Sequence, residues 1–117
     1  MTNSDSILDQ LTEIIEQRKQ APSSRSYTSQ LLDGGVEAIA AKIVEEAAEL
    51  VEAAEDVDRT GNQDDRQHLV REAADLVFHL LVMLGYHELA FSQVEDELAR
   101  RFGVSGLDEK AARASDN

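Results

Sequence analysis

The chain has 117 residues, a length typical of one domain with a single hydrophobic core. Its 24 acidic and 11 basic residues give a net charge of −13, which argues against a nucleic-acid partner because such partners require a basic face. It contains no cysteine, so disulfide bonds and thiolate metal sites are excluded.

The composition predicts an all-α fold. Ala, Leu and Glu dominate and there is one proline, which favours helix throughout. No apolar run approaches the length that crosses a bilayer, and the first six residues lack the pattern of a secretory signal. We therefore expect a cytoplasmic protein without a membrane partner.

The first helix is predicted from about Ser6 to Lys19, where apolar residues recur at helical spacing. Asp5 or Ser6 is expected to cap it. Pro22 and the two serines after it predict the end of this helix and a linker.

A cluster of hydroxyl side chains follows the linker. Arg25-Ser26-Tyr27-Thr28 opens a short segment that is predicted to end at Gly34-Gly35. Ser26 or Thr28 can cap this segment, which is the favoured role. The alternative is that the hydroxyls beside Arg25 hold a phosphate, because backbone N–H groups at a helix start attract anions.

A long amphipathic helix is predicted from about Val36 to Asp58. Its polar face contains Lys42, Glu45, Glu49 and Glu52, with Glu46 at the edge, and its apolar face contains Ile39, Ala40, Ile43, Val44, Ala47, Leu50, Val51 and Ala54. Taken alone, this pattern is that of an ordinary surface helix.

The second long helix is predicted from about Gln67 to Leu89, after a polar turn over residues 59–67 that makes the two helices antiparallel. This helix is apolar around most of its circumference, and its narrow polar strip holds His68, Glu72, Asp75 and His79. A helix of this kind is buried, either in a bundle core or at a subunit interface.

Two carboxylate pairs are the most informative feature of the chain. Glu46 and Glu49 lie three residues apart on one long helix, and Glu72 and Asp75 lie three apart on the other. Packed side by side, the helices would place four carboxylates around one small volume. Carboxylates crowded in this way repel one another unless a cation lies between them, and Mg²⁺, with Mn²⁺ as a substitute, is the expected ion.

Salt bridges are the alternative explanation for buried acids on the second long helix. Lys42 and Arg71 could supply them, but two basic residues are too few for four carboxylates. His79 is interpreted as a hydrogen-bonded core residue, since histidine is a poor ligand for Mg²⁺.

The remaining chain predicts one more helix. Ser92-Gln93-Val94-Glu95 has the pattern of a capping box, and the helix should end before Gly103. The tail that follows has the composition of a frayed terminus.

The carboxylate constellation indicates hydrolysis of a phosphoanhydride. Bound Mg²⁺ would offset charge on the phosphate oxygens and lower the pKa of a coordinated water. Glu45 is placed to accept a proton from that water. The residues alone name no substrate.

The motif Glu45-Glu46-x-x-Glu49 followed by Glu72-x-x-Asp75 resembles that of the all-α (MazG-like) nucleotide pyrophosphohydrolases. Further segments resemble the phosphoribosyl-ATP pyrophosphatase family, whose members catalyse the second step of histidine biosynthesis. These segments are Ser26-Tyr27-Thr28 with Leu31-Leu32, Gly34-Gly35, Ile39 and Lys42; the run from Glu72 to Leu84; and Arg100-Arg101-Phe102-Gly103 with Ser105-Gly106-Leu107 and Glu109-Lys110-Ala111. The resemblance spans about residues 6–113.

This resemblance implies Mg²⁺-dependent hydrolysis of phosphoribosyl-ATP to phosphoribosyl-AMP and pyrophosphate. It implies one catalytic domain over residues 1–117, in an antiparallel bundle with two long central helices that is completed by a homodimer or a higher assembly. The metal ligands would be Glu46, Glu49, Glu72 and Asp75, with Glu45 in support. Substrate contacts would come from Lys42, Arg25, Ser26, Tyr27 and Thr28, with Lys110 and Arg113 as outer candidates.

Two positions depart from the family pattern. Val44 stands where the family usually has glycine, and Phe78 where tyrosine is common. Neither removes a carboxylate. Two alternatives stay open: a house-cleaning pyrophosphohydrolase for non-standard or pyrimidine NTPs, and a non-catalytic helical dimerisation module whose acids are a solvated face.

Overall fold

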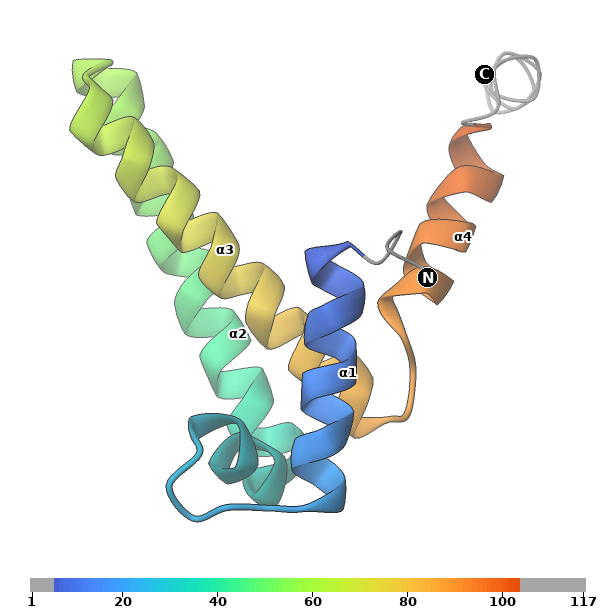
Figure 1. The fold of residues 1–117 in the computed structure, drawn as a ribbon. Helices are drawn as coiled ribbons and strands as arrows, with labels where there is room; N and C mark the ends of the chain where they lie inside the picture. Colours follow the sequence, from blue (N-terminus) through green and yellow to red (C-terminus); the bar gives the residue numbers. More distant parts are fainter. Residues whose placement is uncertain (1–5, 104–117) are drawn as a thin grey trace.

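The structure is a computed structural model and describes residues 6–103. This part of the chain consists of four helices and contains no strand, which confirms the all-α class. The helices are α1 (Ile7–Gln20), α2 (Tyr27–Thr60), α3 (Gln63–Tyr86) and α4 (Phe91–Phe102). Figure 1 shows α2 and α3 as a long antiparallel hairpin, with α1 beside its lower part and α4 beyond α1.

The first helix begins where the sequence predicts. The Ser6 hydroxyl accepts a hydrogen bond from the Asp9 N–H at 3.2 Å, and the Asp9 carboxylate accepts one from the Ser6 N–H in return. This reciprocal pairing satisfies two of the N–H groups that a helix start leaves without partners.

The second helix joins two segments that the sequence analysis separates. Ser26 caps it by accepting a hydrogen bond from the Ser29 N–H at 3.1 Å. The predicted break at the glycine pair is a kink at Gly35, with φ 73° and ψ −165°, after which the helix continues to Thr60. Only glycine adopts this conformation readily, so the kink turns the segment that carries Tyr27 back toward the hairpin without ending the helix.

The turn between the long helices is shorter than predicted. Only Gly61 and Asn62 separate α2 from α3, so the expected nine-residue turn over 59–67 is wrong. Gly61 ends α2 in the left-handed conformation, and Asn62 caps α3 by accepting a hydrogen bond from the Asp65 N–H at 2.8 Å. Asp64 and Asp65 then lie in the first helical turn, where negative charge is favourable. At its other end α3 stops at Tyr86, short of the predicted Leu89.

The fourth helix starts one residue before the predicted capping box. Ser92 does not cap it; the residue before the helix is Ala90, whose N–H donates to the Gln93 side chain at 2.9 Å. Gly103 ends the helix in the left-handed conformation, as predicted. The predicted tail lies outside the described residues.

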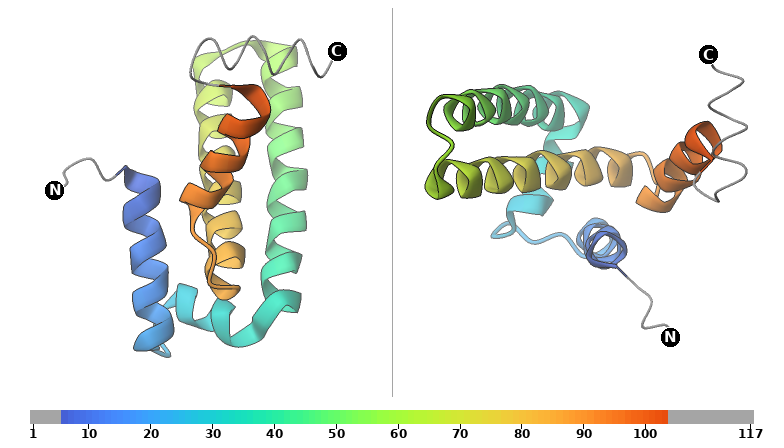
Figure 2. Two further views of the ribbon diagram at one scale, coloured as in Figure 1. Left: turned by 90° about the vertical axis from the view of Figure 1, so that its right-hand side faces the viewer. Right: turned by 90° about the horizontal axis from the view of Figure 1, so that it is seen from above.

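The core lies at one end of the hairpin, where α1 packs against α2 and α3 (Figure 2). Its buried members come from all three helices: Ile15, Leu31, Ile39, Leu81 and Val82. Toward the Gly61 turn, Ala53 is the buried apolar residue of the hairpin among those described. Within one chain, the apolar faces of α2 and α3 are therefore only partly covered toward the Gly61 turn.

Several apolar side chains of the hairpin are exposed in the single chain. On α2, Val44 is 71% exposed and Val51 is 55% exposed, and on α3 Val70 is 60% exposed. The helical spacing of apolar residues shows which face of a helix avoids water, but it does not show which surface covers that face. No helix in the described range is long and apolar enough to cross a membrane.

We predict that Gly35→Ala destabilises the fold more than Gly61→Ala. A side chain at Gly35 would hold a conformation that costs ~1–3 kcal/mol and would approach the Tyr86 hydroxyl to 3.4 Å. At Gly61 a Cβ would meet nothing within 4 Å, and the left-handed conformation alone costs ~1 kcal/mol. Thermal unfolding of the two variants measures the difference, and an equal or smaller loss for Gly35→Ala contradicts the assignment.

Candidate metal and nucleotide site

The structure brings three of the four predicted metal ligands together between the long helices. One carboxylate oxygen each from Glu46 on α2 and from Glu72 and Asp75 on α3 lie within 4.8 Å of one another. Glu46 is buried, Glu72 is partly buried and Asp75 is exposed, so the group opens to solvent on the Asp75 side. We refer to Glu46, Glu72 and Asp75 as the carboxylate cluster.

Two oxygens of the cluster lack a hydrogen-bond partner. They are Oε1 of Glu46 and Oε1 of Glu72, and both are buried. The second oxygen of each glutamate has a basic neighbour: Lys42 Nζ lies 3.8 Å from Glu46 Oε2, and His68 Nε2 lies 3.0 Å from Glu72 Oε2. Basic side chains therefore contact one oxygen of Glu46 and one of Glu72 and leave the other oxygen of each glutamate without a partner. Buried carboxylate oxygens without a donor are costly, and they fit a hard cation that takes oxygen ligands.

Glu49, the fourth predicted ligand, stands one turn along α2 from Glu46 and outside the 4.8 Å group. Its pKa is raised, first by loss of solvent and then by the charges of Glu46 and Glu72. Glu49 therefore interacts electrostatically with residues on both α2 and α3, and its role as a metal ligand stays a prediction.

Glu45 and Lys42 form a pair at the edge of the cluster. Lys42 Nζ lies 3.3 Å from Glu45 Oε1, and the Glu45 side chain is about half exposed. The pKa of Lys42 is raised, chiefly by its hydrogen bond with Glu45. The pair thus places one permanent positive charge and one accessible carboxylate beside the cluster, without adding Glu45 to it.

Tyr27 reaches the same region from the start of α2. Its hydroxyl lies 2.7 Å from Nε2 of His79, and Nδ1 of His79 lies 2.7 Å from the backbone carbonyl of Asp75. Burial raises the pKa of Tyr27, and Glu46, Glu45 and Asp75 add to the rise while Lys42 opposes it. The interpretation of His79 as a hydrogen-bonded core residue is confirmed, since its side chain is 4% exposed and bonded at both nitrogens.

The other predicted substrate residues are less closely tied to the cluster. Ser26 serves as the cap of α2, and Arg25 is exposed in the turn before it. Thr28 lies in the first turn of α2 and is partly buried. Lys110 and Arg113 lie outside the described residues.

His68, for which the sequence predicts no role, shares a hydrogen bond with Glu72. The signal was present, because residues 68 and 72 are four apart and neighbours on one helical face. The link from Tyr27 to His79 had no comparable signal, since the two residues are 52 positions apart.

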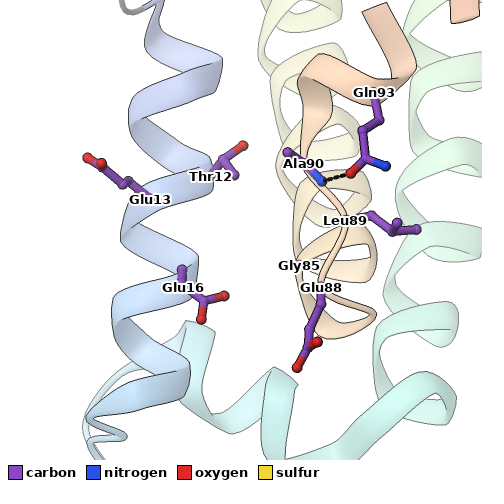
Figure 3. Close-up of a pocket in the computed structure, with 8 residues that line it drawn as sticks. All are labelled: Thr12, Glu13, Glu16, Gly85, Glu88, Leu89, Ala90 and Gln93. Carbon is purple, nitrogen blue, oxygen red and sulfur yellow. Dashed lines mark hydrogen bonds between the residues drawn. The ribbon is translucent and has the colours of Figure 1, made fainter. Parts of the chain in front are cut away.

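A separate pocket of about 500 Å³ lies between α1 and the segment that joins α3 to α4 (Figure 3). It is lined by Thr12, Glu13, Glu16, Gly85, Glu88, Leu89, Ala90 and Gln93, and it contains no member of the carboxylate cluster. Among the described residues that line it, none has a buried oxygen without a hydrogen-bond partner, whereas the carboxylate cluster has two such oxygens. The carboxylate cluster is therefore the better candidate site.

Comparison with known proteins gives a consistent result. The sequence profile of the family described as phosphoribosyl-ATP pyrophosphohydrolase matches residues 8–102. The chain is 51% identical to the phosphoribosyl-ATP pyrophosphatase of Nitrosospira multiformis, over 92% of this chain and 83% of that protein. It is 47% identical to the protein of the same name from Neisseria gonorrhoeae, over 93% and 95%. It is 42% identical to that of Geobacter metallireducens, over 97% of each chain.

We predict that Mg²⁺ or Mn²⁺ raises the melting temperature and that Asp75→Asn abolishes this rise. A cation that binds the folded state stabilises it by mass action, and the substitution removes one charged ligand. Without metal, Asp75→Asn should melt at the same temperature as the wild type or higher, because it removes one of several mutually repelling charges.

Glu55→Gln is the matched control for this prediction. Glu55 is an exposed acid on α2, more than two turns beyond Glu46 and outside the cluster. Its substitution should leave the metal-induced rise intact. A rise that persists in Asp75→Asn would remove Asp75 from the ligand set.

Proposed function

We propose that this chain, which belongs to the phosphoribosyl-ATP pyrophosphohydrolase family, hydrolyses phosphoribosyl-ATP between its α and β phosphates. The products are phosphoribosyl-AMP and pyrophosphate, and the reaction is the second step of histidine biosynthesis. Within the structure, the proposal is supported chiefly by two buried oxygens without a hydrogen-bond partner, one on Glu46 and one on Glu72. They make the cluster a site for a cation, which a phosphoanhydride hydrolase with a net charge of −13 needs in order to bind a polyanion.

The metal proposed is Mg²⁺, held by Glu46, Glu49, Glu72 and Asp75, with Mn²⁺ able to replace it. All four offer carboxylate oxygens, the donors that these hard ions prefer. When bound, such an ion offsets the charge of the phosphate oxygens and makes a coordinated water more acidic. The fit of the residues to the ion is supported by the buried oxygens of Glu46 and Glu72 that lack a hydrogen-bond partner.

The protein's own residues would then orient the phosphate chain and deprotonate the attacking water. Glu45 is the proposed base, because it is accessible and lies next to the cluster without being one of its three members. It accepts a proton from water as the water oxygen bonds to phosphorus and the bridging oxygen leaves with the departing phosphate. Lys42, which holds Glu45, is the proposed positive contact for the phosphate chain.

We further propose that the active form is a homodimer. Ala41, Val44, Ala48 and Val51 are exposed on α2 at successive spacings of three, four and three residues. This spacing forms one continuous apolar stripe of the kind that packs against another helix. In Figure 1 the upper part of the hairpin has no other described helix beside it. A second copy would cover this stripe and complete the bundle.

We predict that the purified protein cleaves phosphoribosyl-ATP faster than any free NTP in a panel with Mg²⁺ present. The comparison separates the biosynthetic role from the house-cleaning alternative, which uses the same metal residues. Release of pyrophosphate measures both. Faster cleavage of a pyrimidine or non-standard NTP would overturn the substrate assignment, and loss of metal binding together with all hydrolysis would favour the non-catalytic module.

We predict that Val51→Asp converts the dimer into a monomer. A charge at Val51, within the apolar stripe, would have to be buried in the dimer without a partner, which is strongly unfavourable. Sedimentation equilibrium should give twice the 12.9 kDa chain mass for the wild type and the single mass for the variant. Ile7→Asp, which adds the same charge at another exposed apolar position, should leave the dimer unchanged. A wild type that sediments as a monomer contradicts the proposal.

A further inference from the structure

The hydrogen bonds of His79 connect two parts of the site that are far apart in sequence. Nε2 meets the Tyr27 hydroxyl at 2.7 Å, and Nδ1 meets the Asp75 carbonyl oxygen at 2.7 Å. Tyr27 stands at the start of α2, while His79 and Asp75 lie on α3. A single buried side chain thus joins the helix start to the backbone of a carboxylate-cluster residue.

The carbonyl fixes the direction of both hydrogen bonds. A carbonyl oxygen only accepts, so Nδ1 of His79 carries the hydrogen. In the neutral imidazole Nε2 is then an acceptor, and the Tyr27 hydroxyl must donate to it. With its proton committed to His79, the phenol oxygen can only accept from a third group. Phosphate oxygens at neutral pH are themselves acceptors, so Tyr27 is a poor partner for them in this arrangement.

Burial divides the roles of the two residues. The His79 side chain is 4% exposed and cannot touch a ligand, whereas Tyr27 is 47% exposed. Three aromatic contacts hold the pair in place: the Tyr27 ring lies 5.7 Å from the His79 ring, and Phe78 lies 5.2 Å from His79 and 6.4 Å from Tyr27. His79 can therefore act on a ligand only through another residue.

We infer that His79 is a positioning residue that sets the Tyr27 hydroxyl as a hydrogen-bond acceptor at the edge of the carboxylate cluster. The group that donates to Tyr27 is an O–H group of the bound ligands. It belongs either to a ribose hydroxyl of the nucleotide or to a water coordinated to the metal. This inference rests on the proposed function. Tyr27 then binds a hydrogen-bond donor and not a phosphate. His79 belongs to the site because it positions Tyr27, in addition to its place in the core.

Two substitutions of His79 separate its two hydrogen bonds. His79→Gln can place an amide oxygen near the position of Nε2 and so keep an acceptor for Tyr27. His79→Asn can place an amide N–H near the position of Nδ1 and so keep the donor to the Asp75 carbonyl, but it offers Tyr27 nothing. Both replace a buried ring by a smaller amide, so the cost to folding is matched, and circular dichroism and melting temperature establish that each variant is folded.

The experiment measures KM for phosphoribosyl-ATP, kcat and the Mg²⁺ concentration at half-maximal activity for the wild type, Tyr27→Phe, both His79 variants and the double variants. Loss of one neutral hydrogen bond should change the affected constant by ~3- to 10-fold in Tyr27→Phe. His79→Asn should reproduce that change, and His79→Gln should restore most of it. In the Tyr27→Phe background, His79→Asn should have no further effect on the same constant.

The affinity of each variant for the product phosphoribosyl-AMP, measured by calorimetric titration with Mg²⁺ present, is a second readout that does not depend on turnover. A weaker product affinity and a higher KM identify the donor as a ribose hydroxyl. A higher Mg²⁺ requirement and a lower kcat, with product affinity unchanged, identify it as a coordinated water. Equal effects of His79→Asn and His79→Gln, or additive effects in the double variant, overturn the inference. A wild type that neither binds the product nor cleaves the substrate overturns the proposed function instead.

Discussion

Carboxylates on two packed helices repel one another across the hairpin of α2 and α3. Folding brings Glu46 against Glu72 and Asp75, and the described residues offer Lys42 and His68 as partial compensation. Two buried oxygens are left without a donor. Such an arrangement is costly in a metal-free fold, and this cost is the physical basis of the proposed cation site.

The remaining elements serve this hairpin. The core around Ile15, Ile39 and Val82 fixes α2 and α3 against α1 at one end of the hairpin. The Gly35 kink then folds the start of α2 back so that Tyr27 reaches His79, which is itself bonded to the Asp75 backbone. The carboxylate cluster and Tyr27 are thereby joined through the His79 side chain and the Asp75 backbone.

Local signals in the sequence predicted much of this. The caps at Ser6 and Ser26 and the stop at Gly103 depend on neighbouring residues, as does the three-residue spacing of each carboxylate pair. The turn was misjudged because residues 63–67 are polar enough for a loop, although Asn62 caps them into α3. The exposure of Val44 and the bond between Tyr27 and His79 could not be predicted, because both depend on which distant surfaces meet.

The two-residue turn at Gly61 and Asn62 also limits how the sequence can change. Each residue of a helix advances the chain by ~1.5 Å and rotates it by ~100°. With so little loop between α2 and α3, a residue gained or lost between Glu46 and Glu72 would rotate one set of carboxylates away from the other. The number of residues between the two acidic pairs is therefore constrained by the geometry of the site.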